Sequence, residues 1–171
     1  MASHDIAAGM LAEFEQELKT TRRFLERVPE DKLGWRPHEK SMTAGELALH
    51  IAEAPEGVVR LCEPDTAEAP SFGGGRPQPS SIREVLESLD QSAACVREVL
   101  PKFNDARMHE TFHVTQCGKP LVSMPRAAFL RSILLNHWYH HRGQLGVYLR
   151  LTGAAVPSSY GPSGDELPKF E

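Results

Sequence analysis

The chain has 171 residues, of which 40% are hydrophobic and 25% charged, and its formal net charge is −4. This composition indicates one folded domain, residues 1–171, and excludes a disordered chain, while an acidic balance without a lysine or arginine run argues against a nucleic-acid partner. No apolar stretch approaches the roughly 20 residues that cross a bilayer and the first residues lack a signal-peptide core, so we expect a cytoplasmic protein without a membrane partner.

The apolar spacing predicts two helices in the first third of the chain. The first runs from about residue 5 to 28, where apolar residues recur by threes and fours. The second begins with Thr43 as N-cap and continues to about Leu61. Glu46, three residues after Thr43, completes a capping-box pattern. Pro55 lies inside the second helix, so we expect a kink or local break just before it.

Two further helices follow in the second half of the chain. The third starts after Ser80 or Ser81, and its apolar stripe consists of Ile82, Val85, Leu86, Leu89, Val96 and Leu100. The fourth starts around Met124-Pro125, because proline suits a first helical turn, and runs to Leu151 before Gly153. Between these helices, two short apolar runs flank Gly118, which indicates a short hairpin or an irregular excursion.

The connection between the second and third helices decides the predicted topology. Residues 63–79 are rich in proline and glycine and hold no periodic pattern. About 16 extended residues span about 50 Å, more than the about 30 Å length of a 20-residue helix. This connection can therefore return the third helix parallel to the second. We expect an all-α fold, a four-helix bundle with up-down-down-up topology and one long crossover.

Three histidines occupy inward-facing positions of two predicted helices. His137 and His141 are four residues apart, so they project from one face of the fourth helix about one turn apart. His50 falls in the apolar stripe of the second helix. Buried imidazoles without partners cost free energy and repel one another when protonated together. A shared divalent cation removes both costs, so the sequence predicts a metal site formed by His50, His137 and His141.

The sequence leaves alternatives to this assignment open. Each histidine can be an ordinary core residue that hydrogen-bonds to a carbonyl or a side chain. His140 is three residues after His137, so a 137/140 pair is also geometrically allowed, although its position on a flanking row favours a place at the edge of the site. Glu46 and Glu53 lie near His50 in sequence and are candidates to orient its second ring nitrogen.

The ligand set limits the metal and its chemistry. Three neutral nitrogen ligands suit zinc, nickel, copper or ferrous iron, and we expect Zn²⁺ or Ni²⁺. A three-histidine zinc site leaves a fourth position for water or substrate, as catalytic zinc does. The cysteines Cys62, Cys95 and Cys117 are odd in number and far apart, which predicts reduced thiols in the core or near the surface rather than disulfides or a nucleophile.

The chain resembles the DinB/YfiT-like family of four-helix-bundle metalloproteins over nearly its whole length. The motifs that carry the resemblance are Trp35-Arg36-Pro37, Gly45-Glu-Leu-Ala-Leu-His50, His137-Trp-Tyr-His-His141-Arg-Gly-Gln-Leu145 and the tail Val156-Pro-Ser-Ser-Tyr160. The resemblance implies an up-down-down-up bundle with His50, His137 and His141 as the metal triad. It also implies a homodimer, and enzymes that conjugate or isomerise small electrophiles with mycothiol, bacillithiol or glutathione.

These expectations define one leading function and two alternatives. The leading function is a metal-dependent transferase or isomerase that takes a small-molecule substrate and a low-molecular-weight thiol. Arg142 and Tyr160 are candidates to anchor an anionic substrate, and no catalytic residue is identified beyond the histidines. The alternatives are a non-catalytic, stress-associated bundle that binds a metal or a ligand, and a metal-dependent hydrolase.

Overall fold

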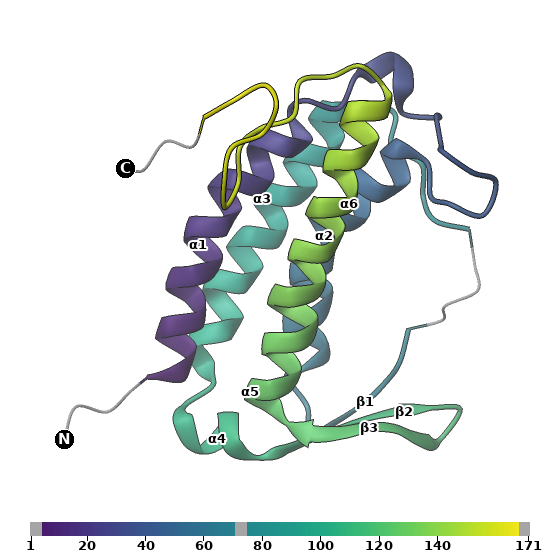
Figure 1. Cartoon of the computed structure of the whole chain (residues 1–171). Helices are drawn as coiled ribbons and strands as arrows, with labels where there is room; N and C mark the ends of the chain where they lie inside the picture. The colour runs from purple at the N-terminus through teal and green to yellow at the C-terminus, as the bar shows by residue number, and fades with distance from the viewer. Residues whose placement is uncertain (1–4, 71–74, 168–171) are drawn as a thin grey trace.

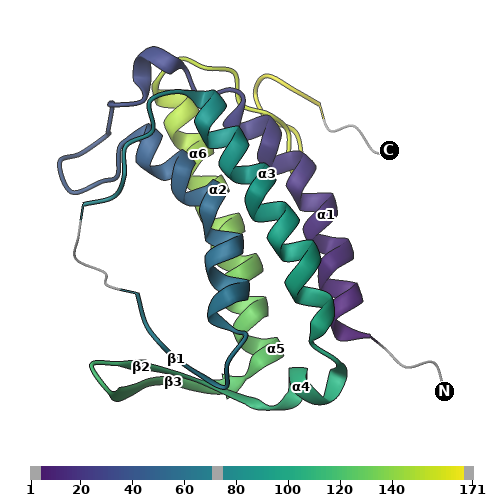
Figure 2. The same cartoon turned by 180° about the vertical axis from the view of Figure 1, so that it is seen from behind.

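The four predicted helices form and pack along one another. In the computed structural model, which describes residues 5–70 and 75–167, they are α1 (Ile6–Leu25), α2 (Ala44–Leu61), α3 (Ile82–Val99) and α6 (His137–Leu151). Figures 1 and 2 show that α1 and α6 run in one direction and that α2 and α3 run in the other, which confirms the predicted up-down-down-up order. Within the described ranges, no helix is long and apolar enough to cross a membrane.

The prediction of a purely helical fold is wrong, because a small sheet lies at one end of the bundle (Figure 1). Its strands are β1 (Thr66–Glu68), β2 (Thr111–Gln116) and β3 (Lys119–Pro125). β2 and β3 form a hairpin whose turn residues, Cys117 and Gly118, both have positive φ, as two-residue hairpin turns require. β1 lies in the crossover and pairs parallel to β2. Three residues are too few to produce an alternating pattern, so the sequence did not reveal β1.

Short helical segments connect the main elements. They are the 3₁₀ helices η1 (Glu30–Lys32) and η2 (Leu100–Lys102), and the helices α4 (Asp105–His109) and α5 (Arg126–Phe129). The fourth predicted helix therefore begins at Arg126, with Pro125 as the N-cap residue. It continues from α5 through a π-helix, η3 (Leu130–Asn136), into α6. A π-helix takes more residues per turn than an α-helix, and such segments often occur at functional sites.

The drift of a straight helix changes which residues of α6 face the core. Along the fourth predicted helix, a seam that advances by steps of four and three consists of Leu130, Leu134, His137, His141, Gln144, Tyr148 and Leu151. Leu130 and Leu134 are buried, but Leu151 at the far end of this seam is 58% exposed. A seam written in strict steps of three and four rotates by about 20° per seven residues around a straight helix. Over the two heptads of α6, from His137 to Leu151, this rotation amounts to about 40° and carries the last residue off the buried face.

α2 continues through Pro55, so the local break that the sequence allowed does not occur. Proline has no N–H, so it leaves the carbonyl of Ile51 without its helical partner. The indole Nε1 of Trp138 in α6 donates to the Ile51 oxygen at 2.8 Å. The next amide, that of Glu56, donates to Oγ of Ser92 in α3 at 2.9 Å. The neighbouring helices thus supply the hydrogen bonds that a proline in mid-helix requires.

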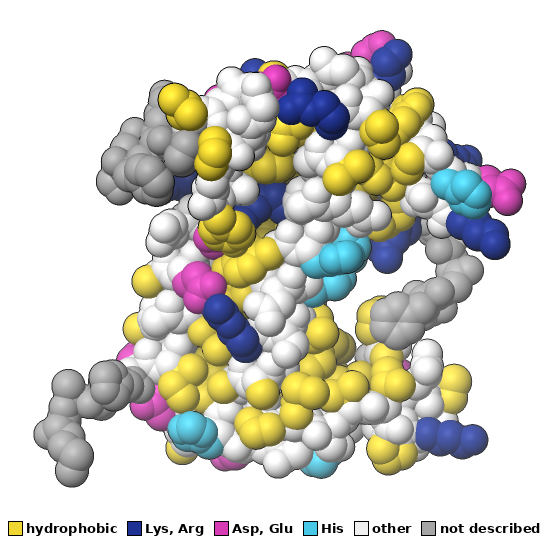
Figure 3. Space-filling model, in the orientation of Figure 1, with side chains coloured by type: hydrophobic (Ala, Val, Ile, Leu, Met, Phe, Trp, Pro, Cys, Tyr) yellow, Lys and Arg dark blue, Asp and Glu magenta, His cyan; other side chains and the backbone are white. Residues whose placement is uncertain are grey.

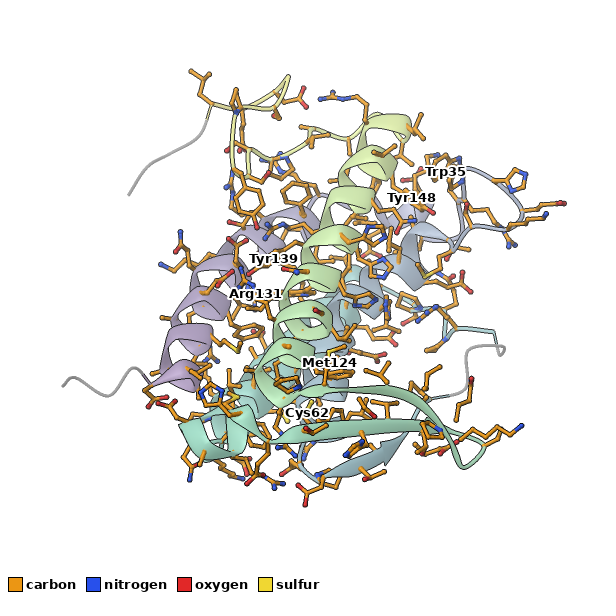
Figure 4. All side chains as sticks on the ribbon, turned by 60° about the horizontal axis from the view of Figure 1, so that its bottom comes forward. Trp35, Cys62, Met124, Arg131, Tyr139 and Tyr148 are labelled. Atoms are coloured by element: carbon orange, nitrogen blue, oxygen red, sulfur yellow. The ribbon has the colours of Figure 1, made fainter. Side chains whose placement is uncertain are left out.

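We expect Trp138→Phe to lower the free energy of unfolding by about 1–3 kcal/mol, because it leaves the buried Ile51 carbonyl unpaired. The smaller ring can still stack on Phe14, whose ring centroid lies 5.0 Å from that of Trp138. Urea denaturation measures the effect. The matched control is Trp35→Phe, since Trp35 is partly buried edge-on against Tyr148 (Figure 4). Equal losses in the two variants would contradict the assigned role of the indole N–H.

Candidate metal centre

The three predicted histidines come together where α2 and α6 pack against each other. One ligand nitrogen from each of His50, His137 and His141 lies within 4.8 Å of the others. The ring centroids are 4.4 Å apart for His137 and His141, and 4.6 Å apart for His50 and His141. All three side chains are half-buried. Because these side chains are only half-buried, the cluster is open to solvent on one side, and Figure 3 shows histidine side chains at the surface at mid-height of the face that α6 forms.

The hydrogen bonds of the rings show which nitrogens are available to an ion. The Nε2 atoms of His137 and His141 are 2.9 Å apart. Nδ1 of His141 lies 3.0 Å from Oε1 of Gln144, an oxygen that only accepts, so Nδ1 carries the proton and Nε2 has the lone pair. Nε2 of His50 is buried without a hydrogen-bond partner in the described part of the chain.

These positions fit a shared transition-metal ion. A tetrahedral ion with nitrogen ligands at about 2.0–2.1 Å spaces those nitrogens about 3.3 Å apart. The buried, unpartnered Nε2 of His50 and the close pair of Nε2 atoms on His137 and His141 lie near that arrangement. The donor set is three neutral imidazoles, and no other histidine, cysteine, aspartate or glutamate of the described residues joins it.

Burial keeps the three imidazoles neutral. It lowers the pKa of His50 to about 3, with a further contribution from the positive charge of Arg76. It lowers the pKa of His141 to about 4 and also lowers that of His137. The neutral ring is the form that binds a metal, so near pH 7 an ion does not have to displace the second proton of a charged imidazolium.

These shifts predict how the stability of the metal-free protein depends on pH. In the unfolded chain each histidine takes up a proton near its ordinary pKa of 6.5, whereas the folded state resists protonation down to about 3 for His50. The unfolded state therefore binds more protons across this window, and stability falls as pH decreases from about 6.5. With EDTA present, we expect the melting temperature to drop between pH 7 and pH 5.

The slope of this drop is the quantity to compare between variants. His50→Gln removes one of the buried titrating rings, so the melting temperature of this variant should depend less steeply on pH between pH 7 and pH 5. His109→Gln, which changes an exposed histidine that is not among the charges acting on the three cluster rings, should leave this pH dependence unchanged. Identical slopes in wild-type protein and His50→Gln would show that burial of His50 does not resist protonation.

The glutamates that the sequence placed near His50 have different positions. Oε2 of Glu46 accepts a hydrogen bond from the Thr43 amide at 2.7 Å, and Oγ1 of Thr43 accepts from the Glu46 amide at 3.0 Å. These two hydrogen bonds confirm the predicted capping box, and the Glu46 carboxylate is used in it. Glu53 lines a small pocket together with His50, and burial raises its pKa, with added repulsion from neighbouring glutamates.

Arg142 points away from the histidines, toward α1. Its Nη1 lies 2.6 Å from Oε2 of Glu17, and its Nη2 donates to the Tyr160 hydroxyl at 2.8 Å. The guanidinium also lies over the rings of Tyr139 and Tyr160, 5.3 and 5.2 Å from their centroids. Tyr139 is labelled in Figure 4. The buried Arg142 is thus neutralised by Glu17 and ties the C-terminal tail to the bundle, in place of the predicted anion-binding role.

Two other features bear on the chemistry of the cluster. Cys62 and Cys95 are buried and Cys117 is exposed, all three as free thiols, and burial raises the pKa of Cys62 to about 12. Arg76, for which no role was predicted, lies with its Nη1 2.9 Å from Nδ1 of His50. It belongs to the crossover, whose sequence has no periodic pattern, so only the folded chain reveals this contact.

Comparison with known proteins gives a consistent result. The model of the DinB family matches residues 1–168. The chain is 29% identical over 161 residues to the uncharacterized protein YrdA of Bacillus subtilis, covering 94% of this chain and 91% of YrdA. It is similar in structure to a DinB-like protein from Bacillus cereus, with a TM-score of 0.71, 24% identity and coverage of 92% and 99% of the two chains. It is also similar in structure to a second DinB-like protein, YjoA of Bacillus subtilis, with a TM-score of 0.65 and 19% identity. That match covers 95% of this chain and 98% of YjoA.

Proposed function

This chain belongs to the DinB family, and we propose that it binds a divalent transition-metal ion through His50, His137 and His141 to join a low-molecular-weight thiol to small electrophiles or to isomerise them. The observation that carries the proposal is the convergence of three neutral imidazole rings on one half-buried point. Zn²⁺ and Ni²⁺ suit this donor set. An ion held by these three histidines would supply Lewis-acid chemistry, which would lower the pKa of a thiol and polarise an electrophile.

The protein's own residues support an external thiol as the nucleophile. No fourth ligand of the described residues joins the cluster, so the set leaves a coordination position to a small molecule. The protein's own thiols are poorly placed to act as the nucleophile, because Cys62 is buried with its pKa raised to about 12 and Cys117 lies in the turn of the β2–β3 hairpin. The open side of the cluster gives a small thiol access from solvent.

The proposal is tested with 1-chloro-2,4-dinitrobenzene and a panel of low-molecular-weight thiols. In this reaction a C–S bond forms, the C–Cl bond breaks, chloride leaves and the thiol proton passes to solvent. We expect Zn²⁺- or Ni²⁺-loaded protein to raise the rate at least about tenfold over the uncatalysed reaction, as differential transition-state binding of about 1.4 kcal/mol would do. His140→Ala should keep the rate. Full activity in a His141→Ala protein shown to be metal-free would defeat the proposal.

A specific observation favours hydrolysis as the second candidate. Glu53 lines the same pocket as His50 and its pKa is raised, which suits a general acid or base. If the protein is a hydrolase, metal-loaded protein should cleave p-nitrophenyl acetate without any thiol, and Glu53→Gln should reduce that rate. A protein that binds metal but shows neither activity would instead fit the non-catalytic alternative. The homodimer stays a prediction. Light scattering on the protein as it elutes from a size-exclusion column measures its molar mass and checks this prediction.

A further inference from the structure

Arg76 is an exposed arginine of the crossover between α2 and α3, and within the described residues it carries an unpaired charge beside the histidine cluster. Its side-chain hydrogen bond among these residues is to His50, with Nη1 2.9 Å from Nδ1. Glu46 and Glu53 line the same small pocket, yet neither forms an ion pair with Arg76 in the described structure. A guanidinium that contacts a neutral ring rather than a carboxylate is free to bind an anion.

The contact between Arg76 and His50 fixes the tautomer of the ring. A guanidinium only donates hydrogen bonds, so Nδ1 of His50 accepts and, in the neutral ring, the proton lies on Nε2. Nε2 is the buried nitrogen without a described partner, the one available to the cluster. An ion on Nε2 requires the opposite tautomer, with the proton on Nδ1 pointing at the guanidinium. The metal and the Arg76 hydrogen bond therefore exclude each other.

Resting on the metal site proposed above, we propose that a metal on His50 releases Arg76, and that the released guanidinium binds the carboxylate of an anionic thiol or substrate at the metal. One imidazole ring separates the guanidinium from the nitrogen that would hold the ion, so both can contact one small ligand. Arginine presents a planar pair of N–H donors that matches a carboxylate. The favoured ligands are small molecules with a carboxylate a few bonds from the reacting group.

The release of Arg76 is tested by measuring the affinity of the protein for Co²⁺ against a chromogenic chelator. Arg76→Gln removes both the competing hydrogen bond and a like charge, so it should bind Co²⁺ at least about tenfold more tightly than wild-type protein. The matched control is Arg83→Gln, since Arg83 is highly exposed and is not among the charges that act on His50. An affinity that is unchanged or weaker in Arg76→Gln would overturn the release.

Carboxylate binding is tested with Co²⁺-loaded protein titrated with 3-mercaptopropionate and with its amide, 3-mercaptopropionamide, followed by the cobalt absorption bands. Wild-type protein and Arg83→Gln should prefer the carboxylate, and Arg76→Gln should reduce that preference about 10- to 100-fold. Arg76→Lys should keep part of it, because it keeps the charge without the paired donors. Direct chelation of cobalt by the carboxylate is common to all variants and cancels in this comparison.

The outcomes separate this inference from the proposed function. An equal preference for the carboxylate in wild-type protein and Arg76→Gln would overturn carboxylate binding by Arg76 while leaving the metal site intact. Failure of wild-type protein to bind Co²⁺ at all would overturn the metal site, and this inference with it.

Discussion

Replacing His141 by alanine is expected to abolish the stabilisation of this protein by metal. With free Zn²⁺ at about 1,000 times its dissociation constant, binding adds about 4.1 kcal/mol to the stability of the wild-type protein. For a chain of this length that corresponds to a rise in melting temperature of about 8–16 °C. Loss of His141 leaves two imidazoles, and the affinity should fall by more than the roughly 100-fold that loss of a supporting contact costs.

The measurement is thermal unfolding with Zn²⁺, with Ni²⁺ and with EDTA. The matched control is His140→Ala, the adjacent residue in α6, which is exposed and lies outside the cluster. It should respond to metal as the wild-type protein does. A metal response that is lost in His140→Ala and kept in His141→Ala would assign the ligands to the 137/140 pair that the sequence also allowed.

Arg126→Met should destabilise the protein strongly, by about 3 kcal/mol or more, because it leaves three backbone carbonyls without their donor. The Arg126 guanidinium is fully buried and joins three segments of backbone. It donates to the carbonyls of Cys62 at 3.0 Å, Arg107 at 2.9 Å and Pro64 at 3.0 Å, and it lies 3.2 Å from Asp65. Methionine fills part of the volume but leaves these carbonyls unpaired, and the end of α2 loses its link to β1 and α4.

Denaturant unfolding of the metal-free protein measures this loss. Arg131→Met is the control, because Arg131 lies nearby in η3 but pairs with Glu13 at the surface, where an ion pair contributes about 0–1 kcal/mol. Comparable losses in the two variants would show that the buried contacts of Arg126 do not decide its contribution. Metal binding should persist in Arg126→Met below its lowered melting temperature, since Arg126 does not contact the histidine cluster.

The sequence predicted the elements whose evidence is local. Thr43 and Glu46 are three residues apart, so their capping box depends only on the first turn of α2 and is confirmed. Ser81 caps α3, and Gly153 has the positive φ expected after a helix. His137 and His141 share a face because α6 is helical between them. Each of these features is fixed by contacts within a few residues, which residue type and spacing alone reveal.

The tertiary structure decided which elements meet and which groups they exchange. The three-residue β1 forms only because β2 offers it a ladder of hydrogen bonds, and α2 passes through Pro55 unbroken because Trp138 reaches the Ile51 carbonyl. Arg142 adjoins His141 in sequence yet turns to Glu17, whereas Arg76 lies beside His50 from 26 positions along the chain. Spacing within a helix tells which face is buried. The partner of a side chain on that face depends on how separate segments pack, and that information is not local in the sequence.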